Sequence, residues 1–330
     1  MLAARFYGIG DVRVEDVPIP PYGPGEALVK VAYAGICGSD LHVFRKGMFV
    51  TSVPVTMGHE FCGTVEAVGL EVTNVKPGDR VVGDPRVSCG TCRYCQSGMD
   101  NCCPQLGFIG EVSPGCFAEY IAVDSRRLLK IPPEVDLKLA SLAEPLAVAV
   151  RIARQARISP NDSLGIVGVG PVGLLTLAVT RTIPVSKVTA IDLSPSRREL
   201  ARKMGADCVL AGFSDDLVGQ ADVAVEAAGT EATLSAALRW VRPKGRVVMA
   251  GIYEKTVSLD PNDIINKEVE VAGSNAYDAS DLHDSVRFLA KASDTVAPII
   301  SHILPLEKAP EAFALLLAPE RSAAKVLLTP

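Results

Sequence analysis

A glycine-rich turn between a buried strand and a buried helix constrains the fold of this chain more than any other sequence feature. Gly168, Gly170 and Gly173 follow one apolar run and open the next. Gly168 permits a tight turn, Gly170 lets the backbone approach a pyrophosphate, and Gly173 lets the helix pack closely on the strand. Asp192 ends the next expected strand, where its carboxylate can accept hydrogen bonds from a ribose. The pattern predicts a dinucleotide-binding βαβ unit.

The same unit indicates which dinucleotide to expect. Asp192 would repel the 2′-phosphate of NADP, so we expect NAD. Arg197 and Arg198 keep NADP open as an alternative, although both can instead lie on a solvated helix face. Gly229 and Gly251 follow later expected strands, where a cofactor contact and a simple turn are both consistent. The candidate cofactor-binding residues are Gly168, Gly170, Pro171, Val172, Gly173, Asp192, Arg197, Gly229 and Gly251.

The spacing of apolar runs changes along the chain. Up to about residue 142 the runs are short and separated by Gly and Pro, which predicts a β-rich, partly closed barrel. From residue 162 strand and helix patterns alternate, which predicts a parallel, doubly wound sheet. From about residue 295 extended pieces return, and we expect them to fold back onto the first domain. We therefore predict an α/β chain in which residues 1–146 and 293–330 form one domain and 147–292 the other.

Individual elements can be placed from the same pattern. Strands are expected at 164–167, 187–191, 208–210, 223–226, 246–250, 269–272, 298–304 and 325–329, and helices at 172–180, 195–204, 279–291 and 306–317. Residues 163–180 carry no charge and reach the lower length limit of a membrane span. Gly168, Gly170 and Pro171 would break a helix in lipid, so a buried strand and helix are expected there instead.

Length and charge restrict the possible partners. A chain of 330 residues suggests two domains. The 33 Lys and Arg against 38 Asp and Glu give a net charge of −5, which leaves no positive surplus for nucleic acid or anionic membranes. A small-molecule substrate fits better. No signal-like segment opens the sequence, so a cytoplasmic location is expected.

Five of the nine cysteines crowd into fifteen residues, which does not indicate a disulfide framework. Cys89, Cys92, Cys95 and Cys103 have the spacing C-x2-C-x2-C-x7-C. Four thiolates at this spacing can close a tetrahedron around a structural zinc ion. An iron–sulfur cluster is the alternative, and Cys102 can replace Cys103 as the fourth ligand.

Four further residues have ligand or acid–base chemistry: Cys37, His59, Glu60 and Glu144. Taken singly, each has a structural explanation, such as a core thiol, a buried histidine or a carboxylate at a helix start. Together with the glycine turn and the cysteine cluster, they resemble the zinc-dependent medium-chain alcohol dehydrogenase family over nearly the whole chain. The resemblance is to its polyol dehydrogenase branch, and it implies a Rossmann sheet with a GroES-like β-barrel catalytic domain.

The resemblance also implies roles for residues. Cys37 and His59 become ligands of a catalytic zinc ion, and Glu60 and Glu144 share the remaining duty, one directly and the other through water or by exchange. Ser39 and His42 correspond to the proton relay. Asp40 corresponds to the carboxylate that orients the histidine ligand. A zinc ion with an open position lowers the pKa of an alcohol hydroxyl, after which hydride can pass to the nicotinamide.

The substrate is expected to be a secondary alcohol in a polyol, cyclitol, sugar-derived alcohol or vicinal diol. Hexitol dehydrogenases of the family carry an arginine before a tyrosine after the last sheet strand, whereas Ala276 precedes Tyr277 here. This weakens a sorbitol assignment, and the segment resembles that of diol dehydrogenases. The alternatives are an amino-alcohol dehydrogenase similar to L-threonine 3-dehydrogenase, and a zinc- and cofactor-binding protein without turnover. Relatives imply a homodimer or homotetramer, with edge pairing through residues 296–306.

Overall fold

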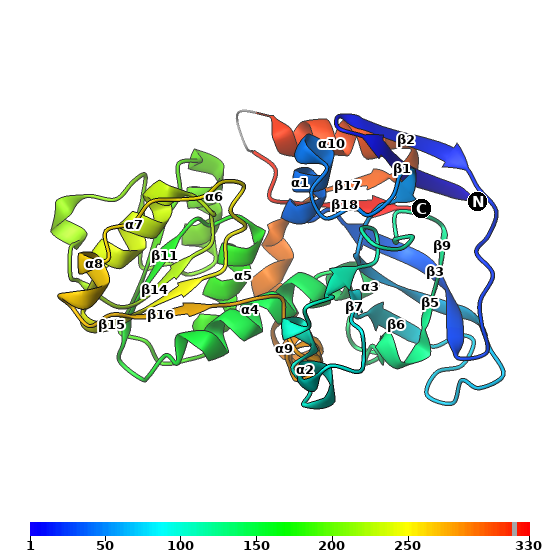
Figure 1. Ribbon diagram of the computed structural model, residues 1–330, viewed down its shortest axis with the longest axis horizontal. Helices are drawn as coiled ribbons and strands as arrows, with labels where there is room; N and C mark the ends of the chain where they lie inside the picture. The colour runs from blue at the N-terminus through cyan, green and yellow to red at the C-terminus, as the bar shows by residue number, and fades with distance from the viewer. Residues whose placement is uncertain (319–321) are drawn as a thin grey trace.

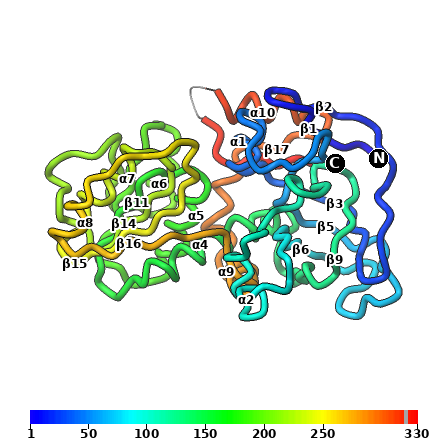
Figure 2. The backbone as a smooth tube through the Cα atoms, viewed as in Figure 1, coloured from blue at the N-terminus to red at the C-terminus, as the bar shows by residue number. Residues whose placement is uncertain are grey.

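Two sheets of different kinds divide the molecule into two lobes that lie side by side (Figure 1). The computed structural model describes residues 1–318 and 322–330. An α/β lobe is built on a six-stranded sheet, and a β-rich lobe on a seven-stranded sheet with a smaller three-stranded sheet beside it. Figure 2 shows that both ends of the chain lie in the β-rich lobe. The chain therefore leaves the first lobe, builds the second and returns.

The sheet of the α/β lobe has the strand order β13-β12-β11-β14-β15-β16, and every pair in it is parallel. The strands are β11 (Ser163–Val167), β12 (Lys187–Ile191), β13 (Cys208–Leu210), β14 (Ala221–Glu226), β15 (Val241–Met249) and β16 (Glu270–Gly273). The order reverses between β11 and β14, which in doubly wound folds marks where a ligand binds at the carboxyl ends of the strands. The predicted α/β fold class is confirmed.

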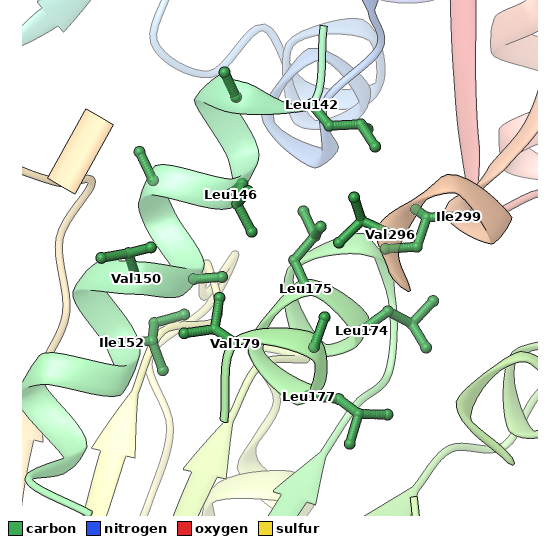
Figure 3. Packing of buried hydrophobic residues seen from close by; sticks show 14 of the residues in the cluster. Leu142, Leu146, Val150, Ile152, Leu174, Leu175, Leu177, Val179, Val296 and Ile299 are labelled. Carbon is green, nitrogen blue, oxygen red and sulfur yellow. The ribbon is translucent and has the colours of Figure 1, made fainter. Parts of the chain in front are cut away.

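Ten α-helices surround or connect the sheets in the described part of the chain. They are α1 (Gly38–Lys46), α2 (Arg93–Gln96), α3 (Leu137–Ala140), α4 (Ala143–Ala156), α5 (Pro171–Thr180), α6 (Pro195–Lys203), α7 (Glu231–Trp240), α8 (Asn262–Ile265), α9 (Ala279–Val296) and α10 (Ala309–Leu317). The uncharged run 163–180 is β11 followed by α5. Leu175 and Val179 of α5 lie beside Leu146 and Ile152 of α4 in the core (Figure 3). Among the described residues, no helix is long and apolar enough to cross a membrane.

The seven-stranded sheet of the β-rich lobe has the order β10-β6-β5-β3-β18-β17, with β9 also paired to β3. Its strands are β3 (Glu26–Gly35), β5 (Glu60–Val68), β6 (Arg80–Gly83), β9 (Tyr120–Asp124), β10 (Leu128–Lys130), β17 (Ile300–Pro305) and β18 (Lys325–Thr329). The two smaller sheets contain β1 (Leu2–Gly8), β2 (Asp11–Asp16), β4 (Val55–Thr56), β7 (Arg86–Val87) and β8 (Gly107–Phe108). Because β18 pairs antiparallel with β3, the last strand completes a sheet that the first part of the chain begins. The residue boundaries of the two domains stay a prediction.

Most differences from the expected elements occur at their ends. β15 starts at Val241, earlier than the predicted 246, because Pro243 and Gly245 hide its first half from the strand pattern. α10 starts at Ala309 because residues 306–308 form a 3₁₀ turn before it. α9 runs on to Val296 through a non-helical residue, Ala292. None of these shifts moves a predicted site residue.

Candidate active site

The four predicted cysteine ligands form a compact group after β7. Their sulfur atoms all lie within 4.8 Å of one another. The Cys92–Cys95 sulfur distance is 3.5 Å, Cys89–Cys103 is 3.6 Å and Cys89–Cys95 is 3.9 Å. A tetrahedron with Zn–S bonds of about 2.3 Å has sulfur–sulfur edges of about 3.8 Å, so this group fits zinc. Cys102 is exposed and lies outside the group.

Backbone amides surround these sulfurs as they would thiolates. The amide of Cys92 donates to the sulfur of Cys89 at 3.3 Å, and that of Gln105 donates to Cys103 at 3.4 Å. Backbone hydrogen bonds from Thr91 and Cys92 lower the pKa of Cys89 to about 6. The Cys89 sulfur is therefore ready to bind a cation at neutral pH.

Cys37, His59 and Glu60 form a second group, and their ligand atoms also lie within 4.8 Å of one another. Cys37 caps α1 directly after β3, and Glu60 opens the neighbouring strand β5. Glu60 lies opposite Gly35, where a Cβ atom would come within 2.2 Å of a Glu60 carboxylate oxygen. Glycine at position 35 is therefore needed to admit this carboxylate. A partly buried thiol that converges in this way with a buried imidazole and a buried carboxylate fits a zinc ion.

Buried polar groups fix the orientation of His59. Its Nε2 atom lies 3.4 Å from the Ser39 hydroxyl, and its Nδ1 atom lies 3.7 Å from a carboxylate oxygen of Asp40. Asp40 also accepts the backbone N–H of Cys37 at 2.8 Å. Burial lowers the pKa of His59, but Asp40 and Cys37 outweigh it and hold that pKa well above its usual value. Asp40 thus lies where it can orient the imidazole toward a metal ion.

Glu60 has a cationic partner that the sequence reasoning missed. The ammonium group of Lys325, at the start of β18, donates to both carboxylate oxygens of Glu60 at 2.7 Å and to the carbonyl of Ile36 at 3.1 Å. Both side chains are buried. The only signal in the sequence is a lysine at the start of an apolar strand. Because Lys325 contacts both carboxylate oxygens, a zinc ion at this site would have to share Glu60 with the lysine.

Glu144 lies close to this group but is not one of its three converging residues. It sits in the first turn of α4, and burial raises its pKa to about 7, with His59 acting in the opposite direction. Tyr277 is fully buried, and burial together with Glu144 raises its pKa well above the usual value. Glu144 and Tyr277 therefore interact with each other in the interior, close to the Cys37 group.

The two predicted relay residues lie one turn apart on α1. Ser39 is buried beside His59, whereas His42 is partly exposed. Nδ1 of His42 lies 2.7 Å from a carboxylate oxygen of Glu254, and Arg45 contacts the same oxygen. Glu254 belongs to the loop after β15 in the α/β lobe, so this contact joins the two lobes. No sequence motif marks Glu254, and the sequence reasoning missed it.

The glycine turn has the geometry that was expected of it. Gly168 has a φ angle of +90°, and a Cβ atom on Gly173 would lie 2.0 Å from the Gly168 carbonyl oxygen. Pro171 and Val172 form the first turn of α5. The two carboxylate oxygens of Asp192 accept backbone N–H groups of Val169 at 2.9 Å and Ser194 at 2.8 Å. Each oxygen keeps a lone pair for a ribose hydroxyl.

Arg197 and Arg198, which keep NADP as an alternative to NAD, lie in different places. A Cβ atom on Gly170 would lie 3.6 Å from a guanidinium nitrogen of Arg197, so Arg197 reaches the glycine turn. Arg198 instead donates to the carbonyls of Asp192 and Leu193, both at 2.8 Å. Arg198 therefore stabilises the end of β12, and Arg197 is the arginine whose guanidinium group lies at the glycine turn.

Gly229 and Gly251 meet at the ends of β14 and β15. A Cβ atom on Gly251 would lie 2.2 Å from the Gly229 amide nitrogen. The buried carboxylate of Glu226 accepts the N–H of Gly229 at 2.8 Å and the hydroxyl of Tyr253 at 2.8 Å. Glu226 thereby fixes both glycine loops at the carboxyl edge of the sheet. Sequence reasoning treated it only as the end of a strand.

Comparison with known proteins identifies the family. Residues 23–133 match the alcohol dehydrogenase GroES-like domain, and residues 171–291 match the zinc-binding dehydrogenase domain. The chain is 34% identical to (R,R)-butanediol dehydrogenase of Bacillus subtilis, with 100% of both chains covered. It is 34% identical to a probable D-xylulose reductase A of Aspergillus clavatus, with 93% of this chain and 90% of the relative covered.

Solved structures agree with these sequence relatives. A zinc-binding dehydrogenase of Sinorhizobium meliloti bound to NADP superposes with a TM-score of 0.93 at 33% identity, covering 100% of this chain and 99% of that one. The chain is an oxidoreductase of the zinc-dependent medium-chain dehydrogenase family. Within that family its relatives place it in the polyol dehydrogenase branch. The predicted family, enzyme class and zinc and nicotinamide cofactors are confirmed, which sets aside a protein without turnover and an iron–sulfur cluster.

Proposed function

We propose that the protein interconverts a secondary alcohol of a polyol or vicinal diol and its ketone, with NAD as the hydride acceptor. The observation that carries this proposal is the convergence of Cys37, His59 and Glu60 beside Ser39 at the start of α1. The names of two relatives, butanediol dehydrogenase and D-xylulose reductase, support this substrate class.

The residues of this site have separable tasks. Cys37 and His59, with a carboxylate from Glu60 or Glu144, would hold zinc, which when bound polarises the alcohol oxygen and lowers the pKa of its hydroxyl. The Ser39 hydroxyl, 3.4 Å from the His59 ring, accepts the substrate proton. His42 lies one helical turn further out and passes that proton toward solvent.

The choice of NAD rests on Asp192. Its carboxylate has one free lone pair on each oxygen for the adenosine ribose, and it would repel a 2′-phosphate. Arg197 near Gly170 is consistent with a pyrophosphate contact that both dinucleotides share. For Asp192→Ser we expect the ratio of kcat/KM for NAD to that for NADP to fall by about 10- to 100-fold. An unchanged ratio would contradict the role of Asp192.

A substrate panel tests the proposed reaction. Zinc-loaded protein is offered NAD with vicinal diols, polyols, cyclitols and amino alcohols, and NADH formation is followed by absorbance. We expect the highest kcat/KM with a diol or polyol. A preference for threonine-like amino alcohols would favour the alternative substrate class. Zinc-loaded protein that binds NADH but turns over none of the panel would overturn the proposal.

We also propose that the protein is a homodimer or homotetramer. β17 is the edge strand of its sheet, and Ile303 on it is 44% exposed. An uncovered edge strand with an apolar side chain can pair with a second copy of itself. Sedimentation at micromolar concentration should show an oligomer, and Ile303→Lys should shift it toward the monomer.

A cytoplasmic location is part of the same proposal. All nine cysteines are free thiols, and both metal sites need thiolates. A reducing compartment keeps such thiols available for zinc. Subcellular fractionation would test this location.

A further inference from the structure

A carboxyl group beside the candidate zinc site has no task in the mechanism above. Glu111 follows β8 in a loop that packs directly against the segment carrying His59. A Cβ atom on Gly110 would lie 2.6 Å from the backbone of Gly58, and the ring of Phe108 lies 5.6 Å from that of His59. The N–H of Glu111 donates to the carbonyl of Phe108 at 3.1 Å. The loop therefore holds Glu111 next to His59.

The Glu111 side chain is buried but unpaired. It is 6% exposed, and within residues 1–318 and 322–330 its carboxyl makes no hydrogen bond or ion pair with another side chain or with the backbone. Neither of its oxygens is among the buried side-chain atoms that are fully sealed without a partner. A carboxyl group that the protein encloses but leaves without a donor loses part of its hydration, and a donor on a bound molecule can replace that water. Such a group, still within reach of a small molecule, indicates contact with a ligand.

The charged neighbours of Glu111 also belong to the active site. They are His59 and Asp40. No lysine or arginine faces it among the described residues. A ligand group that donates a hydrogen bond would therefore stabilise it, whereas a carboxylate or phosphate would be repelled.

We propose that Glu111 is a specificity-determining residue, whose carboxyl accepts a hydrogen bond from a second hydroxyl of the substrate while the first hydroxyl is oxidised. This inference rests on the proposed function and deepens it, because it says why the site would prefer a diol or polyol to a simple secondary alcohol. A site built to hydrogen-bond a hydroxyl discriminates strongly against the analogue that lacks it.

The test compares substrates that differ by one hydroxyl. Wild type, Glu111→Gln and Glu111→Leu are assayed with 2,3-butanediol against 2-butanol, and with 1,2-cyclohexanediol against cyclohexanol. For Glu111→Leu we expect kcat/KM on the diols to fall by about 10- to 100-fold, with a change of less than about threefold on the monoalcohols. Glu111→Gln keeps an acceptor and should lose less. Glu134→Leu, at an exposed turn, is the matched control and should leave both activities unchanged.

Two further measurements make the outcomes distinct. Zinc content and NADH affinity must stay at wild-type values in Glu111→Leu, which separates a specificity role from a folding defect. An unchanged ratio of diol to monoalcohol activity in both variants would overturn the role of Glu111 and leave the proposed dehydrogenase intact. Absence of turnover on every substrate in the wild type would overturn the proposed function and this inference with it.

Discussion

Among single residues, Glu60 and Lys325 form an ion pair that is buried inside the β-rich lobe. The Glu60 carboxylate is fully buried and shares both oxygens with Lys325. Removing one partner of such a pair leaves an uncompensated buried charge, which costs about 3–5 kcal/mol. We therefore expect Lys325→Met to lower the free energy of unfolding by that amount in chemical denaturation.

A matched variant separates this effect from the loss of any surface charge. Lys308 is about half exposed and lies 3.6 Å from Glu311 in a surface pair. Pairs of this kind contribute about 0–1 kcal/mol, so Lys308→Met should change stability by less than about 1 kcal/mol. If both substitutions lowered the free energy of unfolding equally, the buried pair would contribute no more stability than a surface pair, which would contradict the prediction.

The raised pKa of the Glu111 carboxyl group leads us to expect that the stability of the protein depends on pH. Burial raises this pKa from the usual 4.5 to about 7, so the folded state binds a proton more tightly than the unfolded state does. Stability contributed by this group is therefore lost as pH rises from about 4.5 to 7. Glu111→Gln removes the titration and should be more stable than wild type at pH 8, by at most about 3 kcal/mol, since nearby zinc would favour the carboxylate. At pH 4.5 the two proteins should differ little, and denaturation at both pH values checks this.

Among the elements, the loop between β7 and β8 carries the four cysteines of the sulfur group. Two adjacent cysteines in this loop can be compared for their role in zinc binding. Cys103 belongs to the sulfur group, whereas Cys102 is exposed outside it. We expect Cys103→Ser to lose about one zinc per chain and to unfold at a lower temperature. Cys102→Ser should keep the zinc content and unfolding temperature of the wild type. Loss of zinc from both variants, measured by elemental analysis, would contradict this assignment.

The bounds of the helices and strands show how much of the fold the sequence predicts. Strands β12 and β13 and the first turn of α5 lie where the pattern of apolar residues and glycines places them, because strand-to-helix turns depend on local spacing. The predicted strand at 246–250 is shorter than β15 because Pro243 and Gly245 have the pattern of a turn. In the structure these two residues lie in the first half of the strand, where the register to β14 is irregular. Tertiary pairing there overrides the local signal.

At the scale of the whole molecule, the residues that were missed are those whose partners lie far away in the chain. Lys325 meets Glu60, and Glu254 meets His42, across separations of 265 and 212 residues. A lysine or glutamate in isolation carries no spacing that would reveal such a partner. By contrast, the group around Cys89 could be predicted from its local spacing, and the group around Cys37 because the family resemblance supplied the long-range part.

The contact of Glu254 with His42 predicts that proton transfer depends on the contact between the two lobes. Glu254→Gln weakens this contact while keeping the shape of the side chain. We expect kcat to fall by about tenfold, with zinc content unchanged, because His42 loses the group that orients it. Glu134→Gln, at an exposed turn without such a contact, should keep the wild-type kcat. An unchanged kcat in Glu254→Gln would show that the relay does not depend on the other lobe.

The pairing of β18 with β3 also has a consequence for biosynthesis. On the ribosome, Glu60 emerges 265 residues before the lysine that neutralises it. The α/β lobe, whose strands and helices are contiguous in sequence, can fold while the nascent β-rich lobe still lacks Lys325 and leaves the end of β3, at Ala34 and Gly35, without its partner strand. Translation must therefore reach β18 before the zinc pocket is complete, and a stalled or prematurely terminated chain would expose that end of β3 to aggregation.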